Sequence, residues 1–430
     1  MSREDDLLAA CVAAPEDDAP RLVWADAVGG ERGELVVIQC RLAREDLPPA
    51  EAGALLRRAD ELIAAHGKPW SGFADTPAVR KILFRRGFVE AVVANVVEIR
   101  LPAIFEIAPL VTTLELKGIT QVIDHRNRGE RLGPDPIVFL AEMFDQPAFE
   151  RLRGLGIDGA ALYEIIGDDE WDNDYASRAD ELLELIAKTG RLTGMRALAI
   201  HDQFTPRGMH ELLASNVLPS IERLVFDGGQ CTRDQARELL ANTPNLRALD
   251  IGTAIPLSAI ADVIPATLVE LRAPGVQHVD TRSLFTMPAA ATLERLFVNT
   301  HLSPYLDQFG VFQRLRSLDV SYNAVTGPNQ GDSRREAAGK FARASLPALR
   351  EFRVFADLSA QEIHVIAGAY GAQLACLDIR GQNHLASPAL HDRVAGYVRM
   401  GPSAPSESFL HAGINLREPG LGHGIVVVHR

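Results

Sequence analysis

Cysteine and histidine are the residue types in this chain that are best suited to nucleophilic or metal-assisted chemistry. The four cysteines are far apart, and no two of them form a C-x-x-C pair: Cys11, Cys40, Cys231 and Cys376. A disulfide framework normally shows more cysteines in a shorter chain, and a catalytic thiol needs an activating base. We therefore expect buried free thiols in a reducing compartment. A catalytic Cys231 is the alternative, although the GGQCTRD segment around it supplies no clear base.

Histidines gather mildly toward the carboxyl-terminal end, where five of the twelve lie: His384, His391, His411, His423 and His429. No two histidines of the chain are spaced i, i+4, whereas metal sites usually show tighter spacing of their ligands. Surface or hydrogen-bonded histidines are the favoured interpretation, and a metal site is the alternative.

Five carboxylates lie within the seven residues 168–174, around Trp171. Calcium takes oxygen ligands at alternate positions, and Asp172 and Asp174 have that spacing. The glycine and the distal glutamate of a helix–loop–helix calcium site are not in place. A solvated loop and a docking contact anchored by Trp171 are therefore the two main interpretations, with calcium binding as the third.

Common catalytic motifs are absent from the sequence. It contains no G-x-x-x-x-G-K-[ST], no G-x-G-x-x-G after a strand, no H-E-x-x-H and no G-x-S-x-G. We therefore predict no catalytic residues, no bound metal and no cofactor. The chain is expected not to be an enzyme.

Charge and hydropathy narrow the functional classes further. The 430 residues include 44 Lys and Arg against 57 Asp and Glu, which gives a formal charge of −13 and makes general nucleic-acid binding unfavourable. No apolar run reaches the roughly 18 residues of a membrane-spanning helix. The first residues are acidic where a signal peptide would be basic. These features predict a cytoplasmic protein.

A short apolar pattern, L-x-x-L-x-L with substitutions, recurs ten times along the chain. Its fourth positions are Leu114, Leu155, Leu198, Leu224, Leu249, Leu271, Leu296, Leu318, Phe352 and Leu377. Six of the nine steps between them are 22 to 26 residues long. The L-x-L ending alternates apolar and polar residues, as a half-buried strand does. One such strand cannot bury its apolar face alone, so parallel stacking of neighbours is expected.

The residues between these strands suit returning helices. In TRDQARELLAN, Thr232 and Gln235 fit a capping box, and Ala236, Leu239 and Leu240 form an apolar stripe. Strands that alternate with helices predict an α/β fold. Three longer steps contain the insertions 123–136, 167–178 and 326–345, which are expected to be loops near a binding face.

The pattern over residues 88 to 380 resembles the leucine-rich repeat family, whose period is 20–29 residues. The resemblance implies an α/β solenoid with parallel strands on the concave face and helices on the convex face. The asparagine of the full family motif is matched only by Asn323, while Asn383 comes one position late. This departure implies a variant repeat with irregular turns.

The first residues instead predict four helices: 5–14, 19–28, one over the GGERGELVVIQCRLARE segment and 51–66. This segment resembles the bacterial repeat-companion domain, a helical module ahead of leucine-rich repeats in myxobacterial and planctomycete proteins. The matching residues are Leu7-Leu8, Pro15 to Asp18, Arg21-Leu22-Val23, Ala25-Asp26, Arg32-Gly33-Glu34 and Ile38-Gln39. Ala27 stands where the family has a tryptophan. The module's biochemical role is not established, so a structural cap and a docking domain both remain open.

The predicted organisation has three parts. Residues 1–86 form the helical cap, 87–383 the solenoid of ten to eleven repeats, and 384–430 a carboxyl-terminal cap. Within the last part, residues 385–400 are expected to be helical and 424–429 to form a closing strand.

The concave face would present the residues on either side of the fourth position of each motif. The candidates for contact with a partner protein there are Arg223, Val225, Asp250, Arg272, Arg295, Phe297, Asp319, Tyr322, Arg353 and Asp378. Phe297 with its neighbouring arginines is the strongest, because interface hot spots favour aromatics and arginine. The alternative is that these arginines and aspartates only pair with each other across strands.

The favoured function is therefore a non-catalytic protein–protein interaction module or scaffold, which binds through its concave face and inserted loops. Two alternatives remain. One is an enzyme or enzyme subunit with a site near the carboxyl-terminal histidines. The other is a regulatory subunit of a signalling or defence assembly.

Overall fold

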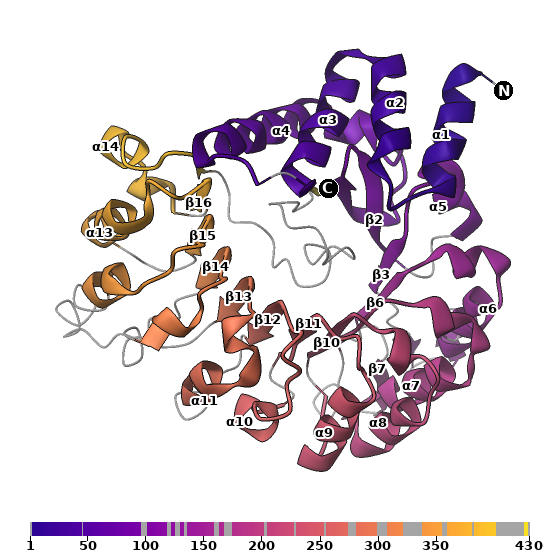
Figure 1. The fold of residues 1–430 in the computed structure, drawn as a ribbon. Helices are drawn as coiled ribbons and strands as arrows, with labels where there is room; N and C mark the ends of the chain where they lie inside the picture. Colours follow the sequence, from indigo (N-terminus) through magenta and orange to yellow (C-terminus); the bar gives the residue numbers. More distant parts are fainter. Residues whose placement is uncertain are drawn as a thin grey trace. The chain divides into compact units, whose positions relative to one another are not determined.

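The chain forms two compact units in the computed structural model, whose ribbon is drawn in Figure 1. The first comprises residues 1–44, 59–245 and 408–430, and the second comprises 45–58 and 246–407. The structure describes residues 2–44, 46–95, 101–117, 122–124, 130–132, 136–158, 163–166, 174–201, 204–227, 229–252, 255–273, 281–298, 308–320, 338–354, 359–380, 382–400 and 425–428.

Four helices begin the chain, as predicted: α1 (Arg3–Ala13), α2 (Asp18–Val28), α3 (Gly30–Arg44) and α4 (Pro49–Trp70). Ser2 and Asp5 form a capping box at the start of α1, and the carboxylate of Asp17 caps α2. The α2–α3 turn uses Gly29 and Gly30, both at positive φ, where glycine is favoured. Helix α4 contributes its residues up to Arg58 to the second unit and the remainder to the first.

The sheet of the first unit is antiparallel at one edge and parallel beyond it. Its strands, in spatial order, are β18 (Ile425–Val428), β1 (Val79–Arg85), β2 (Phe88–Asn95), β3 (Thr113–Lys117), β6 (Gly154–Asp158), β9 (Ala197–His201) and β10 (Arg223–Asp227). Strands β18, β1 and β2 pair antiparallel, so the predicted closing strand at 424–429 is confirmed. From β2 to β10 all pairs are parallel.

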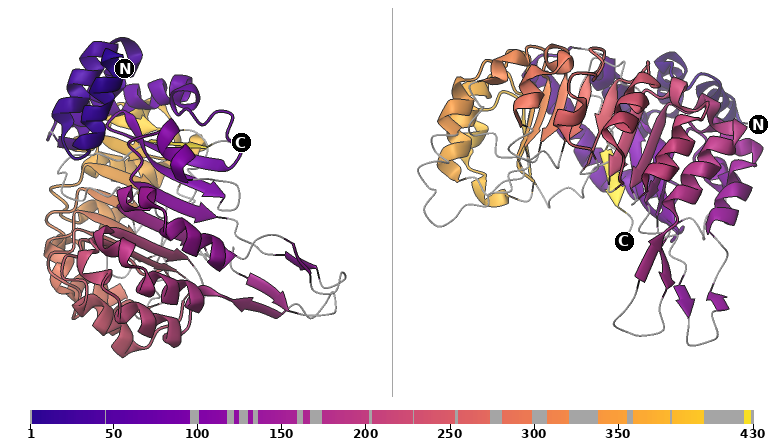
Figure 2. Two further views of the ribbon diagram at one scale, coloured as in Figure 1. Left: turned by 90° about the vertical axis from the view of Figure 1, so that its right-hand side faces the viewer. Right: turned by 90° about the horizontal axis from the view of Figure 1, so that it is seen from below.

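The other helices of the first unit follow the strands in turn: α5 (Leu101–Ile107), α6 (Pro136–Phe144), α7 (Ala179–Lys188), α8 (Pro206–Leu213) and α9 (Arg233–Ala241). Thr232 and Gln235 form the predicted capping box of α9. Two long insertions carry the hairpins β4–β5 (Val122–Asp124, Glu130–Leu132) and β7–β8 (Tyr163–Ile166, Asp174–Ser177). Figure 2 shows these hairpins extending together away from the parallel strands.

The second unit has a parallel sheet in chain order. Its strands are β11 (Ala248–Asp250), β12 (Glu270–Ala273), β13 (Arg295–Val298), β14 (Ser317–Val320), β15 (Glu351–Val354), β16 (Cys376–Asp378) and β17 (Tyr397–Arg399). Helices α10 (Leu257–Ile260), α11 (Thr281–Thr286) and α13 (Ala360–Tyr370) all lie on one side of these strands (Figure 1). Mixed α/β architecture with mostly parallel strands is thus confirmed.

The repeated leucines form the core of each unit. Leu114, Leu155, Leu198 and Leu224 are partners in register across the first sheet, and all are fully buried. In the second sheet the matching row is Leu249, Leu271, Leu296, Leu318, Phe352, Leu377 and Val398, each at most 3% exposed. The period-2 prediction therefore assigned the correct residue of each strand to the core.

One expectation for the carboxyl-terminal part is wrong. Residues 385–400 are not one helix, because only α14 (Pro388–His391) is α-helical there and Tyr397–Arg399 form strand β17. Gly396 permits this pairing, since a Cβ atom at that position would lie 2.1 Å from the carbonyl oxygen of Ala375. The hydrophobic periodicity of a sequence does not indicate such a close approach between two backbone segments.

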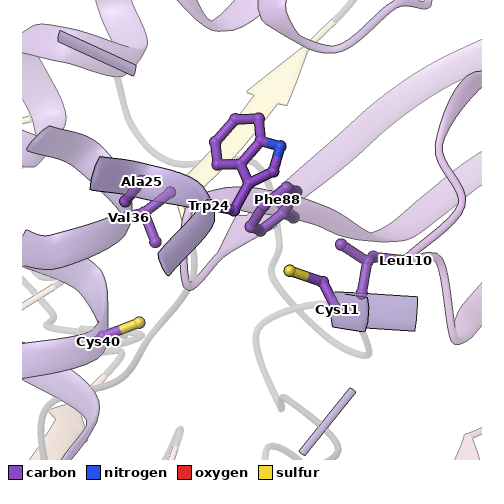
Figure 3. Packing of buried hydrophobic residues seen from close by; sticks show 7 residues of the cluster. All are labelled: Cys11, Trp24, Ala25, Val36, Cys40, Phe88 and Leu110. Atoms are coloured by element: carbon purple, nitrogen blue, oxygen red, sulfur yellow. The ribbon is translucent and has the colours of Figure 1, made fainter. Parts of the chain in front are cut away.

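The amino-terminal helices pack on the β1–β2 hairpin through an apolar cluster (Figure 3). Its buried members are Cys11, Trp24, Ala25, Val36, Cys40, Phe88 and Leu110. The rings of Trp24 and Phe88 have centroids 4.7 Å apart. Helices α1, α2 and α3 are therefore continuous with the hydrophobic core of the first strands.

Buried charges join the same elements. Arg21 of α2 bonds Glu90 of β2 at 2.7 Å, and Arg86 of the hairpin turn lies 3.2 Å from Asp18 and 3.4 Å from Glu90. Arg85 is 3.9 Å from the other oxygen of Glu90. These five side chains are all under 10% exposed. We refer to Asp18, Arg21, Arg85, Arg86 and Glu90 as the hairpin network.

Residues 45–58 pack on the last strands of the second unit. Asp46 forms ion pairs with Arg316 at 2.6 Å and Arg350 at 3.8 Å. A Cβ atom at Gly53 would lie 2.5 Å from the Cα atom of Gly396. The two backbones therefore touch at a pair of glycines.

We expect Gly53→Ala to destabilise the protein by about 1–3 kcal/mol, because the added methyl group meets backbone that cannot turn aside. Alanine is otherwise a better helix former than glycine, so a loss of stability instead of a gain would by itself indicate the close backbone contact. Urea unfolding measures the change. Gly368→Ala in α13 is the matched control, since its Cβ would meet only the mobile end of Arg393 at 3.4 Å. Equal stabilisation by both substitutions would contradict the close glycine contact.

Candidate functional site

A row of polar and aromatic side chains crosses the second sheet at the positions between the core residues. In register from β11 to β17 it consists of Asp250, Arg272, Phe297, Asp319, Arg353, Asp378 and Arg399, which we call the charged row. Because side chains alternate along a strand, these residues point away from the leucine core. The first six are the residues that the repeat pattern placed there. Arg399 was missed, because its strand was expected to be helical.

Phe297 lies beneath a guanidinium at one end of the charged row. The Cζ atom of Arg272 is 4.4 Å from the centroid of the Phe297 ring, within the range of a cation–π contact. Arg272 is held from its other side by Asp250, whose Oδ2 is 3.1 Å from its Nε. Phe297 remains partly exposed. Phe297 and Arg272, which the repeat pattern placed on one face, therefore lie in contact across neighbouring strands.

Toward the other end of the row, Asp378 forms ion pairs with three arginines. Its Oδ2 is 2.6 Å from Arg380, 3.3 Å from Arg353 and 4.0 Å from Arg399. Arg353 also lies 3.7 Å from Asp319 on the preceding strand. The alternative of mutual pairing across strands therefore describes the charges of this row. Each of these side chains is held in a defined position by its neighbours.

A second register line runs beside the charged row, two residues earlier in each strand. It contains Glu270, Arg295, Ser317, Glu351, Cys376 and Tyr397. Arg295 pairs with Glu270 at 3.8 Å. Arg295 is thus turned toward the preceding strand, while Arg272 covers Phe297.

Four of the predicted contact residues are buried: Arg223, Val225, Asp250 and Asp378. Arg223 is 1% exposed and Val225 is fully buried in an apolar cluster with Ala197 and Ala199. The expectation of an exposed surface at these positions is wrong. At Val225 the reason is that small apolar side chains of the neighbouring strand pack beside it. Asp250 is also buried and accepts hydrogen bonds from Arg272 and from the backbone of Gly252. Tyr322 and Trp171 lie outside the described residues.

The cysteines carry no sign of an activated nucleophile. All four are free; Cys11, Cys40 and Cys376 are buried, and Cys231 is partly buried. Burial raises the pKa of the Cys40 thiol to about 12 and that of Cys231 to about 11. A thiol with a raised pKa is protonated at neutral pH, and the thiolate is the nucleophilic form. The prediction of free thiols is confirmed.

Within the described part of the chain, no three His, Cys, Asp or Glu side chains are placed to hold a metal ion. None of its helices combines the length and apolar character that crossing a membrane would require.

Comparison with known proteins gives a single kind of match. No protein-family model and no curated protein matches the chain. Solved structures do match, among them a chain in a crystal structure of a Rad7 and Elc1 complex in yeast. That alignment covers 90% of this chain and 95% of the other, with 14% sequence identity and a TM-score of 0.38. A match at this level of similarity carries no conclusion about the function of this chain.

Proposed function

We propose that the chain is a leucine-rich repeat protein with an amino-terminal repeat-companion module, and that it binds another protein without catalysing a reaction. The observation that carries this proposal is the charged row, in which Phe297 and its arginines form one line across neighbouring strands. Parallel strands in register with helices on one side also suit a solenoid, whose concave face would hold the row.

The ion pairs of the row favour recognition because they preorganise it. A partner does not need to order long arginine side chains that Asp250 and Asp378 already hold, so less conformational entropy is lost on binding. Arginine and aromatic residues are enriched among interface hot spots. Phe297 is the apolar anchor, and the arginines around it provide donors to acidic or carbonyl groups of the partner.

The partner that fits is a protein segment with an apolar side chain flanked by acidic ones. The apolar side chain would pack beside Phe297, where Arg272 covers part of the ring. Acidic groups would reach Arg353 and Arg399, which are both partly exposed. Such a pattern supplies specificity through matched charge as well as burial.

Phe297→Ala tests the proposal in binding assays with a partner that co-purifies with the native full-length chain. We expect the binding free energy to fall by about 2 kcal/mol, which is roughly a thirtyfold increase in Kd, because the substitution removes a hot-spot ring. Arg272→Glu should weaken binding at least as strongly, because it reverses the charge above the ring. Surface plasmon resonance with the purified pair measures both.

Arg314→Glu is the matched control for these variants. Arg314 is exposed and pairs with Glu294 outside the charged row, so its reversal should leave the affinity unchanged. Thermal melts verify that all variants remain folded. Unchanged Kd values for Phe297→Ala and Arg272→Glu would rule out the charged row as the binding surface.

A further inference from the structure

Helix α2 has apolar residues on both of its sides. Its inner side is buried against the β1–β2 hairpin, where Trp24 packs on Phe88. Its outer side is exposed, and Leu22 and Val23 on that side are 38% and 53% exposed. Five residues at the i, i+3, i+4, i+7 and i+8 positions of one helical face make up this side, which we call the outer face of α2: Ala19, Leu22, Val23, Asp26 and Ala27.

This distribution of residues differs from that of an ordinary surface helix. A surface helix turns an apolar stripe toward the core and a polar face toward solvent, whereas a helix that is apolar on all sides is normally buried. In α2 the charged residues Asp18 and Arg21 lie on the buried side, where the hairpin network holds them. Four of the five residues of the outer face are apolar. The outer face therefore has the composition of a surface that another element covers.

The side chains of the outer face suit contact with an α-helix. Ala19, Val23 and Ala27 follow one another at four-residue spacing and form a low ridge of small or β-branched side chains. Leu22 and Asp26 form the ridge beside it at the same spacing. Helices pack by placing such ridges into the grooves of a second helix, and small side chains let the two axes approach closely. A helix seated here would bury Leu22 and Val23 and lie beside the carboxylate of Asp26.

Charge restricts what can occupy this surface. Residues 2–28 expose one guanidinium, that of Arg3, and six carboxylates: Glu4, Asp5, Asp6, Glu16, Asp17 and Asp26. Nucleic acids and anionic membranes carry charge of the same sign, so they are repelled. A symmetric contact with a second copy would bring the same carboxylates against each other. A protein helix that presents basic side chains next to its apolar ones has the complementary charge.

We propose that the outer face of α2 binds an amphipathic α-helix of another protein, with the apolar side of that helix on Leu22 and Val23 and a lysine or arginine at Asp26. Helices of this kind are recognised through apolar anchors one turn apart. This surface belongs to the first unit and shares no residue with the charged row, whose partner segment would be acidic. The two surfaces thus bind segments of opposite charge.

Fluorescence anisotropy with a labelled helical peptide, which has leucine and lysine in a heptad pattern, tests this surface in the full-length protein. We expect saturable binding to the wild type. Val23→Ser removes apolar contact and Asp26→Lys reverses the charge, so each should weaken binding about tenfold or more. Both side chains are exposed, so the substitutions should change stability little, which thermal melts verify.

Helix α6 provides the matched controls. Val138 is 53% exposed, as Val23 is, and the exposed Glu142 follows it one turn later, as Asp26 follows Leu22. Val138→Ser and Glu142→Lys should leave the affinity for the peptide unchanged.

Four results would overturn the proposal. They are the absence of saturable binding, equal affinities for the wild type, Val23→Ser and Asp26→Lys, losses of the same size in the α6 controls, and equally strong binding of a peptide with glutamate in place of each lysine. Analytical ultracentrifugation covers the remaining occupant. A wild-type dimer that Val23→Ser converts to a monomer would identify a second copy as the occupant and would also overturn the proposal.

Discussion

Replacing Glu90 by glutamine is expected to lower the free energy of unfolding by about 3–5 kcal/mol. The substitution keeps the size of the side chain but removes the negative charge that faces Arg21, Arg86 and Arg85 at 2.7, 3.4 and 3.9 Å. Asp18 would then be the one carboxylate left in the hairpin network, and it also pairs with the half-exposed Arg44 at 2.6 Å. Unpaired buried charge is among the costliest defects in a folded protein.

The pH dependence of the Glu90→Gln effect provides a second readout. Burial would raise the pKa of Glu90, but the charges of Arg86, Arg21 and Arg85 outweigh it and leave this pKa below the ordinary value. A carboxyl group with a depressed folded pKa stabilises the protein fully above its unfolded pKa of about 4.3, and this contribution is lost as the pH falls through the folded pKa. The difference between wild type and variant should therefore be constant near neutrality and shrink in acid.

Urea unfolding at a series of pH values measures both effects. Glu150→Gln is the control, because Glu150 pairs with Arg191 at the surface, where an ion pair contributes about 1 kcal/mol or less. A stability loss for Glu90→Gln no larger than that of the control would show that the hairpin network does not hold the helices to the sheet.

Substituting Gly87 by alanine is expected to cost about 3 kcal/mol, from two separate causes. Arg86 and Gly87 form the turn between β1 and β2, with φ angles of 46° and 80°, and an L side chain at such an angle is strained by about 1–2 kcal/mol. In addition, a Cβ atom would lie 2.2 Å from Cγ2 and 2.7 Å from Cα of Val36 on α3. The backbone N–H of Gly87 donates to Gln39 Oε1 at 2.7 Å, which prevents the turn from moving away.

Gly29→Ala separates these two causes. Gly29 also has a positive φ, of 62°, but a Cβ atom there would meet nothing within 4 Å. We expect the stability loss of Gly29→Ala to reflect backbone strain alone. Gly87→Ala should unfold at a lower urea concentration than Gly29→Ala, and its helices α1 to α3 should become accessible to limited proteolysis. Equal losses for the two variants would indicate that α3 does not press on the turn.

The sequence predicted the periodic part of the structure well, for a local reason. Side chains of a strand alternate between two faces, so Leu271 and Leu296 could be assigned to the core and Arg272 and Phe297 to the opposite face without coordinates. The spacing of Thr232 and Gln235 predicted the start of α9 in the same way, because a capping box is formed within one turn. These features depend on neighbours in the chain.

Contacts between distant residues escaped prediction. Nothing local distinguishes Arg32, with its aromatic surroundings, from an exposed helical arginine, because Trp24, Trp70, Phe84 and Phe88 come from four separate elements. Val225 had the alternation of an exposed position, yet neighbouring strands place Ala197 and Ala199 beside it. Strand β17 was missed because Gly396 and Ala375 approach each other only in the folded chain.

The amino-acid sequence by itself determined the ten repeated strands, the side chains with which they line the core, and most of the residues that share the opposite face of the second sheet, because periodicity and capping act over a few residues. The tertiary structure alone decided how the charges of that face pair, which of its positions are covered, and which side of α2 is left exposed. Ion pairing, burial and hydrogen-bond satisfaction depend on groups that come together from segments tens to hundreds of residues apart. The pattern of residue types along the chain gives no spatial distance between such segments.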